Sequence, residues 1–241
     1  SVSGLSLDSR KVKPGQIFVA LPGQHHDGSD FLIQALDRGA RVIFLPGDDQ
    51  LRYQSFSHNH ETCFKVWVPN LKSELSSLAG HFYGNPSEQL KIIAITGTNG
   101  KTSSCHIIAQ LLTQLGKCCA VMGTLGNGLW SDLKPTELTT PDAITTQALL
   151  AKFVALGADY VVMEASSHGL DQNRLSGLSF AAAVFTNLSQ DHLDYHHSLE
   201  VYGASKLRLF SQHRVNQVIV NQDDAFSKQI SKHCQPNSSM W

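Results

Sequence analysis

The sequence is poor in charged and aromatic residues, and it contains no long apolar segment. Charged residues make up 16% and aromatic residues 8% of the 241 residues, and 19 lysines and arginines nearly balance 20 aspartates and glutamates. The net charge of −1 excludes an overall basic field for nucleic acid or an anionic membrane and leaves open only a local patch. Apolar runs such as Val161–Met163 and Ala181–Phe185 fall far short of the about 20 residues of a membrane span.

The sequence also lacks paired cysteine motifs and a secretory leader. Its cysteines number five, an odd count, and no two have the CxxC spacing of a metal or redox pair. We therefore expect a reduced, cytoplasmic protein with incidental thiols. No basic segment followed by an apolar one opens the sequence, which gives no indication of secretion, and Ser1 in place of Met fits an excised or processed piece.

What the sequence does contain is enough apolar material for a substantial core. Hydrophobic residues make up 41%, which excludes a disordered chain, a collagen-like repeat and a polar linker protein. A length of 241 residues corresponds to one large domain or two ordinary ones. The Gly and Pro of Tyr83–Ser87 (YGNPS) predict a hinge, so that residues 1–86 form one domain and residues 87–241 a second.

Residues 1–86 have the pattern of a small mixed α/β domain. Short β-rich or alternating runs predict strands, at Gln16–Leu21, Arg41–Leu45 and Phe64–Val68. Apolar spacing predicts helices at Asp30–Arg38 and Leu71–Phe82, the first with Ser29 as N-cap and Gly39 as stop. The polar residues 47–62 indicate a loop.

In residues 87–241 the sequence pattern changes to apolar runs separated by helical stretches. Five runs predict strands buried on both faces, at Lys91–Thr96, Cys118–Met122, Tyr160–Met163, Phe180–Thr186 and Gln217–Val220. Helices are predicted at Thr102–Leu115, Pro141–Leu156, Leu199–Phe210 and, as a short stretch, Asp223–Lys232. Thr140 is expected to cap the second of these helices, with Pro141 at its first position. Strands that alternate with helices predict right-handed βαβ units and a parallel sheet. Together with the loop described next, this sheet is expected to form a P-loop-type ATPase domain.

Residues Gly97–Thr102 (GTNGKT) lie between a predicted buried strand and a predicted helix. Glycines at 97 and 100 let backbone N–H groups wrap phosphate oxygens, Lys101 can reach the terminal phosphates, and the Thr102 hydroxyl suits Mg²⁺. A strict Walker A run would have its first glycine at position 95, where this chain has Ile95, so the loop is a shorter G-x-x-G-K-T variant. The alternative is an ordinary glycine turn with a solvated lysine, but the order of strand, loop and helix favours a mononucleotide site.

A carboxylate, Glu164, directly follows the predicted strand Tyr160–Met163. Ligands of open α/β sheets gather at the carboxyl ends of the strands, so Glu164 is placed to hold Mg²⁺ beside the phosphate loop. Taken alone, an acid at a strand end is most often simply solvated. Because the phosphate loop is its neighbour, we favour a metal-holding Glu164 over a solvated one.

Longer runs of sequence are far more specific than these features. They are Leu7–Val12 (LDSRKV), Pro14–Leu21 (PGQIFVAL), Asp27 with Gly28, Glu164–Leu170 (EASSHGL) with Gln172 and Arg174, Thr186–His196 (TNLSQDHLDYH) and Tyr202–Lys206 (YGASK). Together they resemble the Mur ligases of bacterial cell-wall synthesis, from Leu5 to about Asn221. The Glu164–Leu170 run resembles the branch that adds the third amino acid, diaminopimelate or lysine. It differs from the branch that adds D-alanyl-D-alanine, which shares the N-terminal motif.

The resemblance implies roles for individual side chains, position by position. ATP contacts are implied for Gly97, Thr98, Asn99, Gly100, Lys101, Thr102 and Asn187. Two magnesium ions are implied, held by Thr102, Glu164 and His192, with a carbamylated Lys206 whose new carboxylate helps to place a metal. A cradle for the uridine nucleotide is implied for Leu7, Ser9, Gln24, His25 and His26. Contacts to the muramoyl peptide are implied for Thr139, Thr140, Ser166, Gln172 and Arg174. Lys101, Glu164, His192 and Lys206 are therefore the catalytic candidates.

Two of these assignments have simpler alternatives. By pattern alone, Lys206 on an amphipathic helix is a solvated lysine. The group His192, His196 and His197 could indicate zinc. However, its spacing is not that of a closed zinc site, and the oxygen-rich setting of a phosphate loop favours Mg²⁺.

The resemblance implies an ATP-dependent amide ligase. ATP would phosphorylate the D-glutamate side-chain carboxylate of UDP-N-acetylmuramoyl-L-alanyl-D-glutamate (UDP-MurNAc-L-Ala-D-Glu), and the amine of a diamino acid would then displace phosphate. We expect a monomer of three domains, of which the third, which binds the amino acid, is absent here, so that the piece alone is inactive. The other hypotheses are a fragment that only binds the UDP-substrate and ATP, and a P-loop switch or motor ATPase.

Overall fold

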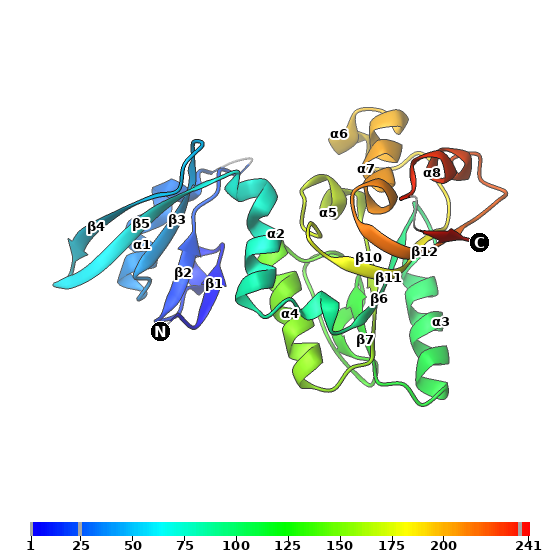
Figure 1. Ribbon diagram of the computed structural model, residues 1–241, viewed down its shortest axis with the longest axis horizontal. Coiled ribbons are helices and arrows are strands. Elements are labelled where there is room, and N and C mark those ends of the chain that lie inside the picture. The colour runs from blue at the N-terminus through cyan, green and yellow to red at the C-terminus, as the bar shows by residue number, and fades with distance from the viewer. Residues whose placement is uncertain (1, 24–25, 236–237) are drawn as a thin grey trace. The chain divides into compact units, whose positions relative to one another are not determined.

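The chain folds into two compact units, Ser1–Leu75 and Ser76–Trp241. The computed structural model describes residues 2–23, 26–235 and 238–241. The division falls inside helix α2 (Leu71–Phe82; Figure 1), before the Tyr83–Ser87 segment where the sequence predicts the boundary. The second half of α2 belongs to the second unit, where the carbonyl oxygen of Ser76 accepts a hydrogen bond from Gln147 Nε2 at 3.1 Å.

The first unit is built on a five-stranded sheet in the order β1-β2-β3-β5-β4. The strands are β1 (Gly4–Ser6), β2 (Gln16–Val19), β3 (Val42–Gly47), β4 (Arg52–His58) and β5 (Glu61–Pro69). All neighbours pair in parallel except β4 and β5. Helix α1 (Leu32–Asp37) and two 3₁₀ turns, Ser9–Lys11 and Gly28–Phe31, complete the small mixed α/β fold that the sequence predicts.

The polar segment 47–62, predicted to be a loop, instead contains β4 and the start of β5. The two strands form an antiparallel hairpin whose turn residues, Asn59 and His60, have φ angles of 49° and 64°. Two positive φ angles are typical of a tight hairpin turn. β4 is an edge strand in which no residue is fully buried and Tyr53 is 76% exposed. Because Phe56 is its one apolar residue packed against the core, the strand shows no apolar alternation by which to recognise it.

Helix α1 begins at Leu32 rather than Asp30, and Ser29 is not its N-cap. The residues before it form a 3₁₀ turn, which is capped by the Asp27 side chain accepting a hydrogen bond from Ser29 N at 2.8 Å. The helix does stop before Gly39, whose φ of 101° lies in the region that favours glycine.

Helix α4 (Ala143–Ala155) is capped by Asp142 and not, as predicted, by Thr140. Asp142 Oδ1 accepts hydrogen bonds from the backbone N–H groups of Ile144 and Thr145, both at 3.0 Å. Thr140 is unavailable as a cap because its hydroxyl donates to the carbonyl oxygen of Glu164 at 2.7 Å. Thr140 therefore ties the segment before α4 to the end of strand β10 (Tyr160–Glu164).

The second unit is built on an eight-stranded sheet in the order β13-β12-β11-β6-β10-β7-β8-β9. Its further strands are β6 (Lys91–Thr96), β7 (Cys119–Gly123), β8 (Gly126–Leu129), β9 (Asp132–Lys134), β11 (Ser179–Phe185), β12 (Arg214–Val220) and β13 (Ser239–Met240). The five predicted strands pair in parallel, which confirms the predicted sheet. The antiparallel hairpin β8–β9 at one edge was not predicted.

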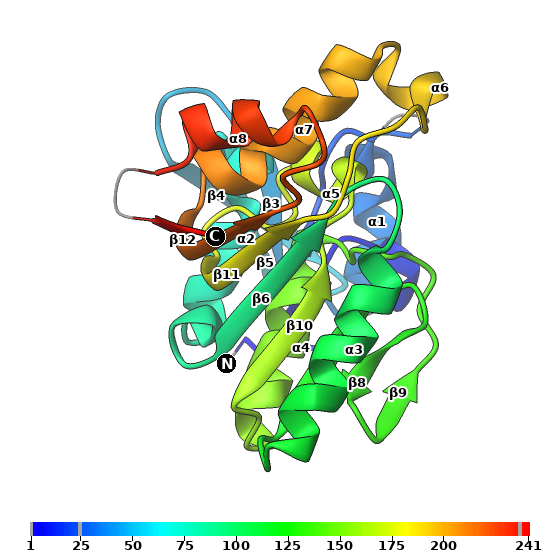
Figure 2. The ribbon, with the colours of Figure 1, turned by 90° about the vertical axis from the view of Figure 1, so that its right-hand side faces the viewer.

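Helices cover both faces of this sheet. They are α3 (Lys101–Gln114), α4, α5 (Ser167–Asp171), α6 (Leu193–His196), α7 (Leu199–Ser211) and α8 (Ser227–His233). Figure 2 shows α3 and α4 on opposite sides of β6 and β10. Ile92 of β6 accordingly packs with Phe153 of α4, whereas Ile95 packs with Cys105 of α3. Within the described part of the chain, no helix combines the length and apolar character needed to cross a bilayer.

Candidate active site

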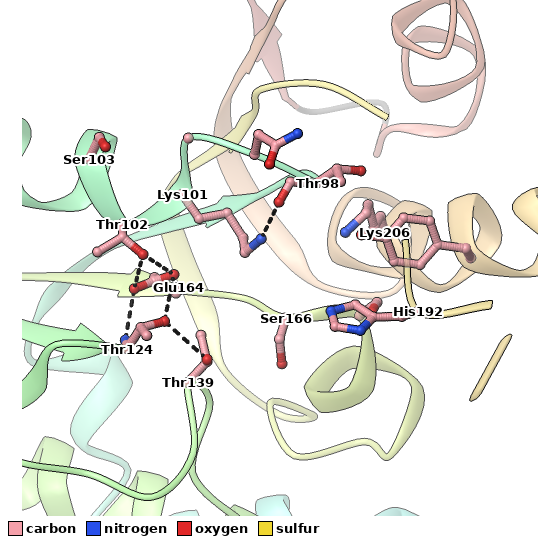
Figure 3. A pocket seen from close by; sticks show the side chains of 14 residues that line it. Thr98, Lys101, Thr102, Ser103, Thr124, Thr139, Glu164, Ser166, His192 and Lys206 are labelled. Atoms are coloured by element: carbon pink, nitrogen blue, oxygen red, sulfur yellow. Dashed lines mark hydrogen bonds between the residues drawn. The ribbon is translucent and has the colours of Figure 1, made fainter. Parts of the chain in front are cut away.

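A cavity of about 370 Å³ lies where strands β6, β7 and β10 end. It brings together the candidates that the sequence places far apart, namely Lys101, Thr102, Glu164, His192 and Lys206. Loop residues Thr98, Asn99 and Gly100 and the peptide-contact candidates Thr139 and Ser166 line the same cavity (Figure 3). The carboxyl ends of parallel strands are the usual ligand site of an open α/β sheet.

The phosphate loop connects β6 to α3 through two glycines that no other residue could replace without strain. Gly97 has a φ of 147° and Gly100 a φ of 84°. At Gly97 a Cβ atom would also overlap the hydroxyl oxygen of Thr186. The loop therefore needs glycine both for its backbone conformation and for its close approach to the segment after β11.

That segment, Thr186–Ser189, holds the loop in shape. The Thr98 hydroxyl donates to the carbonyl oxygen of Ser189 at 3.1 Å and accepts from Ser189 N at 2.9 Å. Asn187 Oδ1 accepts from Asn99 N at 3.0 Å, and Asn187 Nδ2 donates to the carbonyl oxygen of Asn99 at 3.1 Å. Asn187, expected to contact the nucleotide, thus bonds to the loop backbone and is not among the residues that line the cavity.

The Lys101 ammonium is held against the backbone of the phosphate loop. Its Nζ donates to the carbonyl oxygens of Gly97 and Thr98 at 2.9 and 2.8 Å. Desolvation lowers the pKa of Lys101, while the negative charges of Glu164 and Asp191 oppose that shift. A partly desolvated cation in this place interacts strongly with a terminal phosphate.

Glu164 is the buried anion of the cavity, with 1% of its surface exposed. Both carboxylate oxygens accept from the Thr102 hydroxyl at 3.0 Å, and Oε1 also accepts from Thr124 N at 2.8 Å. Within residues 2–23, 26–235 and 238–241, no ion pair involves Glu164. A buried carboxylate beside a threonine hydroxyl is a set of hard oxygen donors that fits Mg²⁺.

His192 reaches the same cavity from the start of α6. Its φ is 52°, and its ring lies 4.9 Å from that of His168 and 6.1 Å from that of Tyr202. Its side chain is about half exposed, at 48%. The described ranges contain no group of three His, Cys, Asp or Glu side chains arranged to hold a metal ion.

Lys206 is buried and is not the solvated lysine that the helical pattern alone predicts. It is 1% exposed on α7, and its Nζ donates to the carbonyl oxygen of Gly97 at 2.8 Å. The Nζ also lies 4.1 Å from the ring centre of Tyr202, one turn earlier on the helix. Burial, with a smaller effect from the Lys101 charge, lowers the pKa of Lys206 to about 7. A substantial fraction of this amine is therefore neutral near pH 7.

The lowered pKa of Lys206 makes folding stability depend on pH. At pH values below about 7 the amine is protonated in both the folded and the unfolded state. Between about 7 and 10.5, the ordinary pKa of a lysine, the folded state binds fewer protons than the unfolded state, so the free energy of unfolding rises with pH. We expect Lys206→Met to remove this rise, which amounts to at most about 1.4 kcal/mol per pH unit.

The measurement is denaturant unfolding of the wild type and of Lys206→Met at pH 6, 7, 8 and 9, in buffer free of CO₂. The difference in unfolding free energy between the two proteins isolates Lys206, since other titrating groups are common to both. A difference that stays constant from pH 6 to pH 9 would contradict a lowered pKa of Lys206.

Four of the five peptide-contact candidates, Thr140, Ser166, Gln172 and Arg174, form one hydrogen-bond network. Arg174 donates to Gln172 Oε1 from Nε at 3.1 Å and from Nη2 at 2.6 Å, and from Nη1 to the carbonyl oxygen of Thr140 at 2.6 Å. The Thr140 hydroxyl accepts from Ser166 N at 3.0 Å. Thr139 lies across from these residues, with its hydroxyl 3.0 Å from that of Thr124. Thr140 is 1% exposed, and its hydroxyl and its carbonyl oxygen are both hydrogen-bonded within the protein.

The uridine-cradle candidates lie in the first unit around a second cavity, of about 590 Å³. Leu7, Ser9 and His26 line it, together with Asp8 and Arg10, which form an ion pair at 2.9 Å. The Ser9 hydroxyl donates to Gln34 Oε1. Gln24 and His25 lie outside the described residues.

Four residues that line the active-site cavity were not among the sequence candidates: Ser103, Thr124, Ser167 and Tyr202. Thr124 could have been found, because it directly follows strand β7 as Glu164 ends β10. Tyr202 lies one helical turn before Lys206, which is a signal only once that lysine is known to be buried.

Two family models match the chain. The catalytic domain of the Mur ligase family matches residues 1–83, and the Mur ligase middle domain matches residues 95–240. The chain belongs to the Mur ligase family. The resemblance seen in the sequence is thereby confirmed, and the phosphate loop of this Mur ligase chain lies within the middle-domain match.

Curated relatives of this Mur ligase chain are named UDP-N-acetylmuramoyl-L-alanyl-D-glutamate–2,6-diaminopimelate ligase. The one from Ectopseudomonas mendocina is 45% identical over 228 residues, covering 95% of this chain and 46% of the relative. The one from Chromobacterium violaceum is 42% identical, covering 99% of this chain and 48% of the relative. The chain thus spans about half the length of the curated relatives it matches.

Solved structures match the Mur ligase chain over nearly its whole length. A UDP-N-acetylmuramoyl-L-alanyl-D-glutamate–2,6-diaminopimelate ligase is 35% identical with a TM-score of 0.83, covering 99% of this chain and 47% of that chain. A MurF ligase from Thermotoga maritima in complex with ADP is 20% identical with a TM-score of 0.67, covering 98% of this chain and 49% of that chain. The second match shows the shared fold alone, and both confirm the predicted fold class.

Proposed function

We propose that the protein containing this chain is an ATP-dependent ligase. It would join a diamino acid to the D-glutamate side chain of UDP-MurNAc-L-Ala-D-Glu. The observation that carries the proposal is that one cavity is lined by the phosphate-loop cation Lys101, the Thr102–Glu164 pair and the peptide-contact candidates Thr139 and Ser166. The names of the relatives favour 2,6-diaminopimelate over L-lysine as the diamino acid.

The proposed reaction has two steps. A carboxylate oxygen of the D-glutamate side chain attacks the γ-phosphorus of ATP. The bond from this phosphorus to the bridging oxygen breaks, ADP departs, and the substrate becomes an acyl phosphate. The amine of the diamino acid then attacks the acyl carbon, the C–O bond to phosphate breaks, and the amine proton passes to solvent. The first step brings two anions together, and the Lys101 ammonium lies where it can offset their repulsion.

We propose that Thr102, Glu164 and His192 hold Mg²⁺, which when bound neutralises charge on the phosphates. Support comes from the buried Glu164 carboxylate and its 3.0 Å contact with the Thr102 hydroxyl. We further propose that Lys206 is carbamylated, with its neutral amine adding to the carbon of CO₂ and losing a proton. Its burial and its pKa of about 7 support this, since only the unprotonated amine reacts.

We place the uridine nucleotide in the cavity of the first unit, beside Leu7, Ser9 and His26. The residues that select the diamino acid would belong to the half of the ligase that this chain does not span. The full ligase would be a monomer in the cytoplasm, where ATP and UDP-linked precursors are available.

The test is ADP formation by the full-length protein with ATP and Mg²⁺. We expect release that requires both UDP-MurNAc-L-Ala-D-Glu and a diamino acid. ADP formation that is indifferent to both would favour a P-loop switch or motor ATPase instead. Binding of the UDP-substrate without turnover under these conditions would favour a protein that only binds.

A further inference from the structure

The hydroxyl of Tyr195 joins two of the peptide-contact candidates to a fixed carboxylate. Tyr195, on α6, donates from its hydroxyl to Asp171 Oδ2 at 3.0 Å and accepts from Gln172 Nε2 at 3.1 Å. The other end of the Gln172 amide, Oε1, accepts from Nε and Nη2 of Arg174. Four side chains therefore form one chain of hydrogen bonds in which each donor faces an acceptor.

This chain of hydrogen bonds fixes which end of the Gln172 amide faces Arg174. With Nε2 bonded to the Tyr195 hydroxyl, Oε1 must point at the guanidinium. A flipped amide would turn its NH₂ group toward the guanidinium, which has only donors. Gln172 thereby occupies the Nε and Nη2 edge of Arg174 and holds the guanidinium in one orientation. The N–H groups left on Nη1 and Nη2 are the ones that can donate to a carboxylate.

Tyr195 is itself held in place by its neighbours. Its ring lies 4.2 Å from the ring of His168 on α5 and 4.7 Å from that of His196. Its acceptor is anchored by Arg208 of α7, whose Nη1 donates to the carbonyl oxygen of Asp171 at 2.9 Å. Burial raises the pKa of Tyr195, so the hydroxyl keeps its proton and remains a donor to Asp171.

We propose that Tyr195 is a positioning residue for the muramoyl peptide. Acting through Gln172, it keeps the Arg174 guanidinium oriented for a carboxylate of the peptide, and it sets the affinity for this substrate while leaving the ATP site unaffected. Tyr195 does not line the active-site cavity, so its effect on the substrate is indirect. The inference rests on the proposed function, because it takes the peptide substrate from there.

The test is Tyr195→Phe in the full-length protein, which removes only the hydroxyl. We expect the KM for UDP-MurNAc-L-Ala-D-Glu, and its Kd by calorimetry, to rise about five- to tenfold, the scale of one lost hydrogen bond. The KM for ATP and kcat should stay within about twofold of wild type. The matched control is Tyr160→Phe, at the start of β10, where Lys91 Nζ contacts the tyrosine ring. This variant should change neither the KM for UDP-MurNAc-L-Ala-D-Glu nor the KM for ATP.

A double-mutant cycle separates positioning through Gln172 from a general structural effect. In a Gln172→Ala background, adding Tyr195→Phe should raise the substrate Kd by less than about twofold, because the group through which it acts is gone. Asp171→Asn weakens the acceptor of the Tyr195 hydroxyl and leaves the Tyr195 ring in place. It should raise the Kd for UDP-MurNAc-L-Ala-D-Glu and leave the KM for ATP unchanged.

Three results would overturn the proposal: a full additional effect in the Gln172→Ala background, an equal rise in the KM for ATP, or unchanged substrate binding by Tyr195→Phe. Failure of the proposed function is a separate outcome. It would appear as absent ligation by the wild type and Tyr160→Phe alike, while the calorimetric comparison still tests Tyr195.

Discussion

Lys101→Ala is expected to lower ATP-dependent ligation by the full-length protein on the order of 10³-fold. The ammonium is the charged group bonded to the phosphate loop at Gly97 and Thr98, where developing charge on the transferred phosphate needs stabilisation. Lys206 donates to the same Gly97 oxygen but is buried with a pKa of about 7, so it cannot supply a full positive charge in its place. Affinity for the UDP-substrate should remain near the wild-type value, because the proposed uridine cradle is in the first unit.

The matched control for Lys101→Ala is Lys117→Ala, which removes an exposed lysine just beyond the other end of α3. It should leave both ligation and substrate affinity unchanged. Steady-state ligation rates and calorimetric titration of UDP-MurNAc-L-Ala-D-Glu give the two readouts. Equal loss of ligation and of UDP-substrate affinity in Lys101→Ala would mean that the division into two sites is wrong.

Glu164→Gln is expected to raise the Mg²⁺ concentration for half-maximal rate at least tenfold and to lower kcat on the order of 10²-fold. The substitution keeps the shape of the side chain and removes its negative charge. Its Oε1 can still accept from Thr124 N, and its NH₂ group can donate to the Thr102 hydroxyl, so the fold should persist. The loss therefore reports the charge that Mg²⁺ would require and not a collapse of the cavity.

Magnesium titrations of the ligation rate measure this effect, with Glu88→Gln as the control. Glu88 is exposed in the short 3₁₀ turn Pro86–Glu88 and does not line the cavity. Removing its charge should leave the magnesium requirement unchanged. If Glu164→Gln has the magnesium requirement of the wild type, Glu164 is not a metal-holding residue.

The centre of the second unit could be predicted from the sequence because the residues of its central strands share one environment, the buried interior. Strand β6 runs from Lys91 to Thr96 as predicted, since side chains on both of its faces are buried. The phosphate loop follows from local chemistry, as the backbone at Gly97 and Gly100 requires glycine. Glu164 follows from topology, because a residue that ends a central parallel strand must lie at the ligand edge.

The features that the sequence did not predict depend on tertiary contacts. Strand β4 lies at a sheet edge and is largely exposed, and the strands of the edge hairpin β8–β9 are only four and three residues long, so neither shows an apolar pattern. The helical pattern around Lys206 is the same whether the lysine is solvated or buried, so it does not predict the burial. Its burial comes from contacts with Gly97, more than a hundred residues earlier, and with the Tyr202 ring. The Tyr195 network likewise joins α5 and α6 through side chains alone.

The most direct test of the proposed ligase is the transfer of oxygen from substrate to phosphate. The full-length protein is supplied with ATP, Mg²⁺, a diamino acid and UDP-MurNAc-L-Ala-D-Glu labelled with ¹⁸O in the D-glutamate side-chain carboxylate. If an acyl phosphate forms in the cavity between Lys101 and Ser166, each phosphate released carries one ¹⁸O atom, as mass spectrometry would show. Ligated product accompanied by unlabelled phosphate would contradict the account.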